Sequence, residues 1–165
     1  QQGHRDIAII VPEQFPEGLE RFEGYRRALS EAGIPFNPDL VIRGEYSSTT
    51  DASGLDVARL KAILPRCSAI FATSDLLAMA AKEAARSEGY FLGKDIALVG
   101  YDGSEAGRHL DPPLTSVLQD GGAMGSAAVE IILAQMQGET APRSVLVPTR
   151  LVVRESSLVS GTSRG

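Results

Sequence analysis

Apolar residues in the first part of the chain form short continuous runs that alternate with segments of helical periodicity. Residues 7–11 are an apolar run rich in β-branched side chains and ended by Pro12, which is typical of a strand buried on both faces. Over residues 17–32 the apolar positions recur at helical spacing, and Gly33 then supplies a stop signal. The pattern predicts a strand, a loop and a helix in that order.

The same unit recurs along the chain. Further strands are predicted at 40–42, 69–72 and 96–99, followed respectively by a helix at 53–64, a helix at 75–87 and a loop at 100–103. Parallel strands joined by right-handed helical crossovers are the economical arrangement of such units. We therefore predict an α/β fold with an open, parallel, doubly wound sheet and helices on both of its faces.

The pattern changes after the two prolines at 112–113. A short strand is predicted at 114–118, and Asp120 is placed to cap a helix over 120–137 with a well-formed apolar face. The remaining features are apolar stretches at 145–147 and 151–153 and a Ser- and Gly-rich end at 156–165. Such an end is typical of a disordered segment.

The composition is that of an ordinary globular protein, since 43% of the 165 residues are hydrophobic and 22% are charged. The net charge is -5 and no run of Lys or Arg is present, so these residues are not expected to bind nucleic acid themselves. The apolar runs are far shorter than the roughly 20 residues that span a bilayer, and no membrane association is predicted.

The single cysteine, Cys67, excludes an internal disulfide and fits a reducing cytoplasm, although periplasmic proteins without disulfides also have this pattern. Because Cys67 precedes a buried strand, we interpret it as a small core residue and not as a nucleophile. The chain begins at Gln1 with neither an initiator Met nor a signal peptide, and we expect it to be a fragment.

Ligands of open α/β sheets bind at the carboxyl ends of the strands, so the loops that follow the strands are the candidate site. These loops contain no glycine-rich phosphate-binding motif, which disfavours nucleotide binding. They carry instead a cation, two carboxylates, an aromatic ring and hydroxyls, namely Arg21, Asp75, Asp102, Tyr46, Thr73 and Ser74. This set suits a polyol, because charged groups pair with vicinal hydroxyls and a ring stacks on a pyranose.

Each charged residue of this set has a simpler alternative. Arg21 falls in the first turn of its predicted helix, where the macrodipole disfavours a cation, so a nearby anion is expected from Asp102, Glu17 or a ligand. The alternative is a solvated surface arginine. Asp75 opens a helix, and its position there favours a capping or first-turn role over a ligand contact. Asp102, before Gly103, has the alternative of capping the next turn.

The positions of the histidines in the sequence disfavour an enzymatic function. Only His4 and His109 are present, and neither lies beside a plausible nucleophile. Cysteine, histidine and carboxylate side chains show no metal-ligand spacing either. We predict no catalytic residue, no metal and no cofactor, and keep an enzyme with Asp75 or Asp102 as a reactive carboxylate only as a third hypothesis.

Six segments together resemble the LacI/GalR family of bacterial transcription regulators in order and spacing. They are GHRDIAII at 3–10, RFEGYR at 21–26, AIFATSD at 69–75, DIALVGYD at 95–102, PPLTSV at 112–117 and VRESS at 153–157. The resemblance implies an effector-binding core like that of periplasmic sugar-binding proteins, with two α/β subdomains and a ligand in the cleft between them.

The resemblance also implies roles for particular residues. Arg21, in the R-x-x-G-[YFW] motif, would contact effector hydroxyls, Tyr46 would stack in the pocket, and Asp102 would bind hydroxyls. Ser74, at a position where Asn is common, would face the ligand, and Gln119 would lie near the floor of the cleft. The predicted ligand-binding set is Arg21, Tyr46, Ser74, Asp75, Asp102 and Gln119.

The implied domain division follows the same resemblance. It assigns 1–119 to the C-terminal subdomain, 120–148 to a helix and strand of a largely absent N-terminal subdomain, 149–157 to a return strand and 158–165 to a disordered tail. A DNA-binding helix-turn-helix would lie upstream of this chain. We expect 120–148 either to dock on another chain or to pack on residues of a longer protein.

Taken together, the sequence favours the cytoplasmic effector-sensing domain of a regulator, in which a sugar or related metabolite controls operator binding allosterically. The resemblance also implies a homodimer through the helices that follow the second and third strands. The helix at 75–87, which is apolar nearly all round, agrees with this, and its burial within its own chain is the alternative. The alternative is a periplasmic sugar-binding protein of a transport system. The segments PPLTSV and VRESS favour the regulator.

Overall fold

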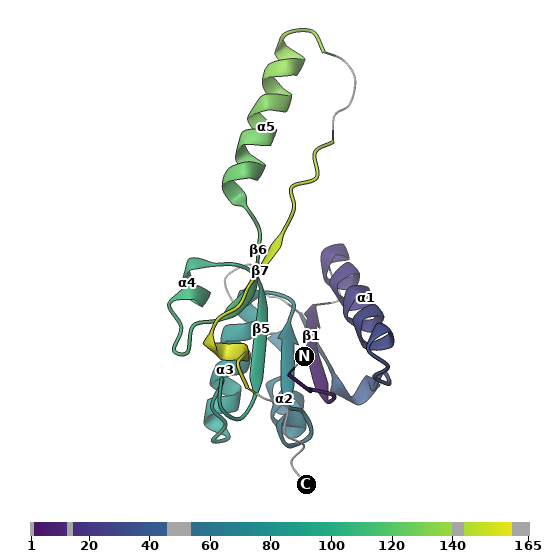
Figure 1. The fold of residues 1–165 in the computed structure, drawn as a ribbon, viewed down its shortest axis with the longest axis vertical. Coiled ribbons are helices and arrows are strands. Elements are labelled where there is room, and N and C mark those ends of the chain that lie inside the picture. Colours follow the sequence, from purple (N-terminus) through teal and green to yellow (C-terminus); the bar gives the residue numbers. More distant parts are fainter. Residues whose placement is uncertain (1, 13–14, 46–53, 140–143, 160–165) are drawn as a thin grey trace.

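The computed structural model has a seven-stranded sheet at its centre, and it describes residues 2–12, 15–45, 54–139 and 144–159 (Figure 1). The spatial order is β3-β2-β1-β4-β5-β6-β7. The parallel strands are β1 (Ile7–Pro12), β2 (Val41–Glu45), β4 (Ala69–Ala72), β5 (Ala97–Asp102) and β6 (Thr115–Leu118). Two antiparallel strands, β3 (Gly54–Leu55) and β7 (Arg150–Val152), pair at the edges. The predicted open, doubly wound α/β sheet is therefore confirmed, with two edge strands added.

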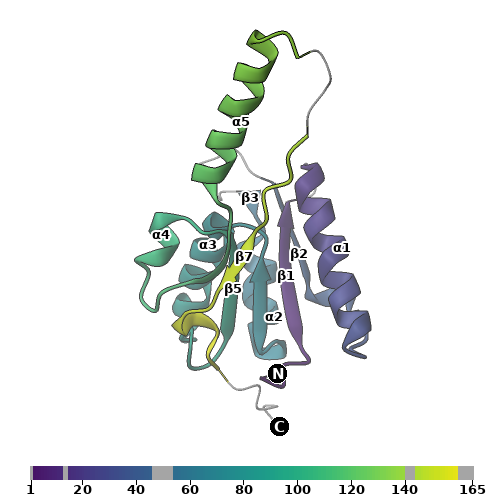
Figure 2. The same cartoon turned by 45° about the horizontal axis from the view of Figure 1, so that its top comes forward.

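Helices cover both faces of this sheet (Figure 2). The helices are α1 (Pro16–Glu31), α2 (Val57–Ile63), α3 (Asp75–Ser87), α4 (Glu105–Arg108) and α5 (Gly121–Met136), of which α1 packs on one face and α2 and α3 on the other. Side chains of β1 alternate between two cores: Ile9 packs with α1, and Ile10 packs with the larger core that α2 and α3 share. Both isoleucines are fully buried, which explains why the strand reads as an uninterrupted apolar run.

Two helix starts differ from the sequence prediction. The second helix starts at Val57, not at residue 53, because Asp56 accepts a hydrogen bond from the Arg59 backbone N–H and the preceding residues 54–55 pair with β2. The first helix starts at Pro16, so Arg21 lies in its second turn and not in its first. The dipole of α1 consequently disfavours that arginine less than the sequence suggested.

Residues 144–149 pair with no strand among those described, so the strand predicted at 145–147, which was assigned to the largely absent subdomain, stays a prediction. The predicted disorder from residue 156 onward is wrong for its first two residues, which are buried in a short 3₁₀ helix at Glu155–Ser157. The Ser156 hydroxyl donates to the Leu98 carbonyl at 2.7 Å and accepts from the Thr115 N–H at 2.8 Å. These hydrogen bonds supply the order that the composition did not indicate.

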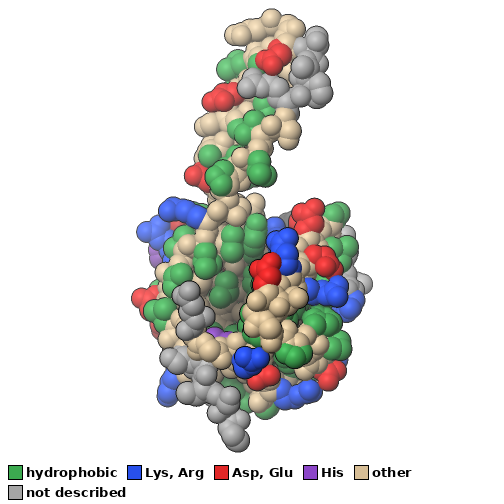
Figure 3. Space-filling view, turned by 45° about the vertical axis from the view of Figure 1, so that its right-hand side comes forward, with side chains coloured by type: hydrophobic (Ala, Val, Ile, Leu, Met, Phe, Trp, Pro, Cys, Tyr) green, Lys and Arg blue, Asp and Glu red, His purple; other side chains and the backbone are tan. Residues whose placement is uncertain are grey.

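Helix α5 stands away from the sheet, and the segment 144–149 returns beside it (Figure 1). Asp120 caps the helix as predicted, accepting from the Ala123 N–H at 2.9 Å. No residue of this helix is buried within the described structure, and its apolar side chains lie open along it (Figure 3). A groove of about 380 Å³ runs between Met124 and Ile131 on the helix and Val145 on the returning segment. None of the helices described is long and apolar enough to cross a membrane.

Candidate functional site

Most of the predicted site residues gather where the parallel strands end. Asp102 is the last residue of β5, Gln119 directly follows β6, and Ser74 and Asp75 directly follow the loop after β4. Arg21 reaches this edge from α1. The first turn of α1 lies close to the end of β1, because a Cβ at Gly18 would stand only 2.3 Å from the Pro12 carbonyl oxygen. The small residue thus lets the helix bring its arginine to the strand ends.

Arg21 is held by two contacts. Its Nη1 donates to the Thr73 carbonyl at 2.7 Å, and its guanidinium carbon lies 3.8 Å from the centroid of the Tyr101 ring. A cation over an aromatic face at this distance is attracted by the ring quadrupole. Tyr101 was missed as a site residue by sequence reasoning, although the aromatic of the G-Y-D segment was the available signal.

Asp102 combines an unusual backbone with a partly buried carboxylate. Its φ of 110° lies in the left-handed region, which non-glycine residues adopt only when the surrounding structure holds them there. Its Oδ1 accepts from Gln119 Nε2 at 2.8 Å, and its carbonyl accepts from the Gln119 N–H at 3.2 Å. Strained backbone of this kind concentrates at functional sites.

Opposing effects act on the pKa of Asp102. Burial raises the pKa above its usual value, the Arg21 charge lowers it, and the negative charge of Asp75 raises it again. The hydrogen bonds from Gln119 and from the backbone of Asp75 lower it. The pKa of Asp102 is raised overall. Arg21, which was expected to lie near an anion, is the cation that lowers this pKa.

Ser74 and Asp75 have different roles at the start of α3, which the sequence did not distinguish. Ser74 is the N-cap of α3 and accepts from the Leu77 N–H at 3.2 Å, whereas Asp75 is the first helical residue. Asp75 is 1% exposed, and its two oxygens accept from the Ser116 hydroxyl and the Ser104 N–H, each at 2.6 Å. Its side chain therefore lies behind the surface of the site. The last predicted contact, Tyr46, lies outside the described residues.

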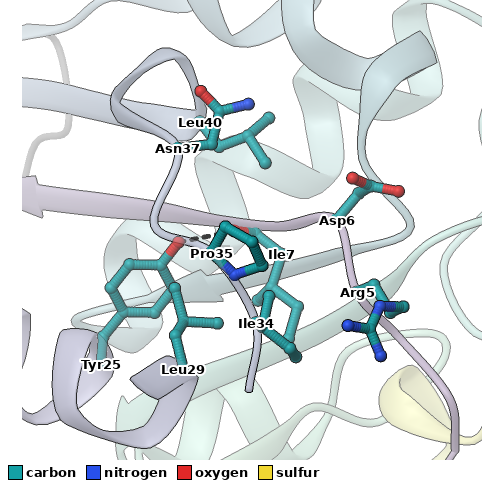
Figure 4. Close-up of a pocket in the computed structure, with 9 residues that line it drawn as sticks. All are labelled: Arg5, Asp6, Ile7, Tyr25, Leu29, Ile34, Pro35, Asn37 and Leu40. Atoms are coloured by element: carbon teal, nitrogen blue, oxygen red, sulfur yellow. Dashed lines mark hydrogen bonds between the residues drawn. The ribbon is translucent and has the colours of Figure 1, made fainter. Parts of the chain in front are cut away.

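A separate cavity of about 230 Å³ lies at the opposite end of the sheet, beside the start of β1 (Figure 4). It is lined by Tyr25, Leu29 and Ile34 among other residues, and none of the predicted site residues contributes to it. The Tyr25 hydroxyl donates to the Ile7 carbonyl at 2.7 Å, and burial raises the pKa of Tyr25 to about 12. The polar cluster and this cavity are thus at different ends of the fold.

Chemistry based on Cys67 is disfavoured by its position. The thiol is buried, lies 3.9 Å from the Leu64 carbonyl oxygen, and has its pKa raised to about 12, chiefly by burial and additionally by the charge of Asp6. No cluster of three or more Cys, His, Asp or Glu side chains suitable for a metal occurs in the described part of the chain. The core interpretation of Cys67 is confirmed by its burial.

We expect native Cys67 to resist iodoacetamide at pH 8, because only the thiolate reacts and burial suppresses both its formation and its access. Intact mass spectrometry should find less than about one tenth of the chain alkylated under conditions that modify it fully in guanidinium chloride. The denatured sample is the control for reagent activity. Rapid labelling of the folded protein would contradict the burial of this thiol.

The fold and its polar strand-end cluster define an α/β domain of the ligand-binding kind. The family of periplasmic binding protein-like domains matches residues 1–157. The transcriptional regulator CelR of Thermobifida fusca is 38% identical over 158 residues, which are 94% of this chain and 46% of the relative. The ribose operon repressor of Haemophilus influenzae is 33% identical over 157 residues, with 93% of this chain and 46% of the relative covered.

Solved structures give the same result. A CelR–cellobiose complex superposes with a TM-score of 0.82 at 39% identity, covering 94% of this chain and 47% of that one. The dimeric Lac repressor superposes with a TM-score of 0.82 at 27% identity, covering 97% and 58%. The chain belongs to the family of periplasmic binding protein-like domains, and its resemblance to LacI-type regulators is confirmed. These relatives are transcription regulators, and the chain spans about half the length of CelR and of the ribose operon repressor.

Proposed function

We propose that this chain is part of the effector-sensing region of a LacI-type transcription regulator that binds a sugar or related metabolite. The observation that carries the proposal is the clustering of Arg21, Asp102 and Gln119 at the carboxyl ends of the parallel strands. A guanidinium, a carboxylate and an amide offer donors and acceptors to neighbouring hydroxyls on one ring. Effector binding would bias an equilibrium between arrangements of the whole protein and so control its DNA affinity.

Within this site we propose direct effector contacts for Arg21, Asp102 and Gln119. Ser74 caps α3 at the same edge and is proposed to face the effector, and stacking by Tyr46 stays a prediction. Asp75 supports the site from behind, since both of its oxygens already accept hydrogen bonds within the chain. Because the CelR structure at 39% identity holds cellobiose, a glucose disaccharide is the first effector to test.

The full protein is proposed to contain a second α/β subdomain that covers α5 and residues 144–149. Four apolar residues of the helix occur at i, i+3, i+4 and i+7 and are each more than half exposed: Val129, Ile132, Leu133 and Met136. This stripe is a complete helical face with no covering element among the described residues. The match covers 46% of the length of CelR, so a protein of that size has room for such a subdomain.

Ile132→Asp is expected to lower the free energy of unfolding of the full-length protein by about 3 kcal/mol, because it would bury an unpaired carboxylate against the second subdomain. Urea denaturation measures this change. Glu130→Gln, on the same helix, is the matched control and should change stability by less than about 0.5 kcal/mol. Equal stability of the Ile132→Asp and wild-type proteins would show that the stripe is not covered.

The proposed partners follow from the same relatives. A Lac repressor dimer at 27% identity is bound to operator, and we propose that the full protein is a cytoplasmic homodimer that binds DNA through an upstream helix-turn-helix. Leu76 and Met79 on α3 are only partly buried in the single chain, which supports this helix as part of a dimer contact. A transport protein is disfavoured, because the relatives named above are regulators.

A thermal-shift screen of the full-length protein tests the proposal, with pentoses, hexoses, disaccharides, sugar phosphates and nucleosides as ligands. A ligand present at a hundred times its dissociation constant stabilises a folded protein by about 2.7 kcal/mol, which raises the melting temperature measurably. A stabilising sugar that also changes operator binding in a mobility-shift assay would support the sensor. A folded protein that no ligand stabilises would contradict it.

A further inference from the structure

Asp75 sits at the junction of three elements that form the candidate site. It begins α3, its Oδ2 accepts from the Ser104 N–H, and its Oδ1 accepts from the Ser116 hydroxyl on β6. The Ser116 oxygen in turn accepts from the Gly103 N–H at 3.1 Å. Two successive N–H groups after Asp102 are therefore fixed by one buried carboxylate, one directly and one through a hydroxyl.

The backbone that these hydrogen bonds hold is the strained turn of the site. Asp102 has a φ of 110° and Gly103 a φ of 72°. The turn packs tightly on β6, since a Cβ at Gly103 would lie 2.3 Å from Leu118 Cδ1. A non-glycine residue keeps such a conformation only when its neighbours determine it. The hydrogen bonds donated by the Gly103 and Ser104 N–H groups hold this backbone, in addition to those between Asp102 and Gln119.

Two glycines leave the space that the Asp75 carboxylate occupies. A Cβ at Gly100 would stand 2.3 Å from Asp75 Oδ1, and a Cβ at Gly107 would stand 3.0 Å from Asp75 Oδ2. The capping of α3 is already supplied by Ser74, so Asp75 is not required as an N-cap. Its 1% exposure leaves no direct access for an effector.

We propose that Asp75 is a positioning residue, which holds the turn 102–104 and thereby sets the orientation of the Asp102 carboxylate. The consequence for effector binding rests on the function proposed above. The described charged groups that act on Asp102 are Arg21 from α1 and Asp75 from α3, and they act in opposite directions. Asp75 therefore influences Asp102 both through the backbone and through its own charge.

Asp75→Asn tests both effects with little change in size. In hydrogen exchange followed by mass spectrometry on the full-length protein, a peptide containing residues 103–104 should exchange at least about tenfold faster than in wild type, because the Ser104 N–H loses a charged acceptor. The matched control is Asp95→Asn, which also removes a carboxylate that accepts a backbone N–H, from Phe91 at 2.9 Å, in the loop before β5. That variant should leave the 103–104 peptide unchanged.

The affinity for cellobiose, measured over a range of pH, supplies the readout that a merely structural role would not move. Protonation of Asp102 weakens its contact with an effector, so affinity falls as the pH falls through the pKa of Asp102. Asp75→Asn removes a charge that raises this pKa, and the fall in affinity should move to lower pH. At neutral pH we expect an affinity about tenfold lower than wild type, because the carboxylate is less well oriented.

The outcomes separate this inference from the proposed function. Faster exchange at 103–104 in Asp75→Asn but not in Asp95→Asn supports the positioning role even if wild type binds no sugar, a result that would count against the sensor alone. Wild-type exchange and a wild-type pH profile in a folded Asp75→Asn protein would overturn the inference. If that variant does not fold, Ser116→Ala followed by NMR decides: faster exchange of the Ser104 N–H, which donates to Asp75 and not to Ser116, supports the role, and unchanged exchange overturns it.

Discussion

Replacing Arg21 with alanine is expected to lower the affinity of the full-length protein for its sugar effector about a hundredfold. Hydrogen bonds from a charged donor contribute roughly 1.5–3 kcal/mol each, and about 2.7 kcal/mol corresponds to this change. The loss also removes the cation that lowers the pKa of Asp102, so the remaining carboxylate is protonated more readily. Isothermal titration calorimetry with cellobiose, or with the sugar that the screen selects, measures the effect.

Arg26→Ala is the matched control for this prediction. Arg26 lies on the same helix but is paired with Glu23 at 3.3 Å and lies 5.3 Å from the Phe36 ring, away from the strand ends. Its removal should leave the affinity within about twofold, since exposed ion pairs contribute little. An Arg21→Ala protein that binds the sugar as tightly as wild type would exclude Arg21 from the contact set.

Replacing Gly100 with alanine should be the most damaging single methyl addition in the β5 strand, with a loss of about 3 kcal/mol in the free energy of unfolding. The new Cβ would meet Asp75 Oδ1 at 2.3 Å and Leu114 Cδ2 at 2.9 Å. The Asp75 carboxylate cannot move aside without breaking its hydrogen bonds with Ser104 and Ser116. Guanidinium chloride denaturation checks the loss.

The same substitution at Gly24, Gly24→Ala, is expected to have the opposite effect on stability. Nothing lies within 4 Å of a Cβ at Gly24, in the interior of α1, so the substitution should stabilise the protein by roughly 0.5–1 kcal/mol through helix propensity. If Gly100→Ala proved as harmless as Gly24→Ala, the close packing around the Asp75 carboxylate would be refuted.

Local sequence signals were sufficient to predict the elements in which the apolar pattern and the terminating residues indicate the same bounds. The predicted helix at 75–87 has the observed bounds of α3, because an apolar face and a capping serine occur at the same place. The strand at 69–72 is likewise observed as predicted, since a buried parallel strand needs only a short apolar run. The rule that ligands bind at the carboxyl ends of parallel strands located Arg21 and Asp102 at one edge, and the family resemblance added Gln119.

Other features depend on partners that are distant in sequence, and no local pattern reports them. Among the described residues, the apolar stretch at 145–147 has no neighbouring strand with which it could pair, and strand formation requires one. Ser156, in a segment with the composition of a disordered end, is buried because the Leu98 carbonyl and the Thr115 N–H, both far away in sequence, meet it. The residue Tyr101 joins the site only because α1 carries Arg21 across it.

The sequence by itself determined the α/β class, the order of the parallel strands along the chain and the edge at which polar residues gather, because these follow from periodicity and strand direction. The tertiary structure decided which of the neighbouring polar residues caps the helix and which is buried. Ser74 and Asp75 are adjacent in sequence and similar in capping preference. Only the space left by Gly100 and the donors on Ser104 and Ser116, contributed by three other segments, assign the carboxylate to the interior.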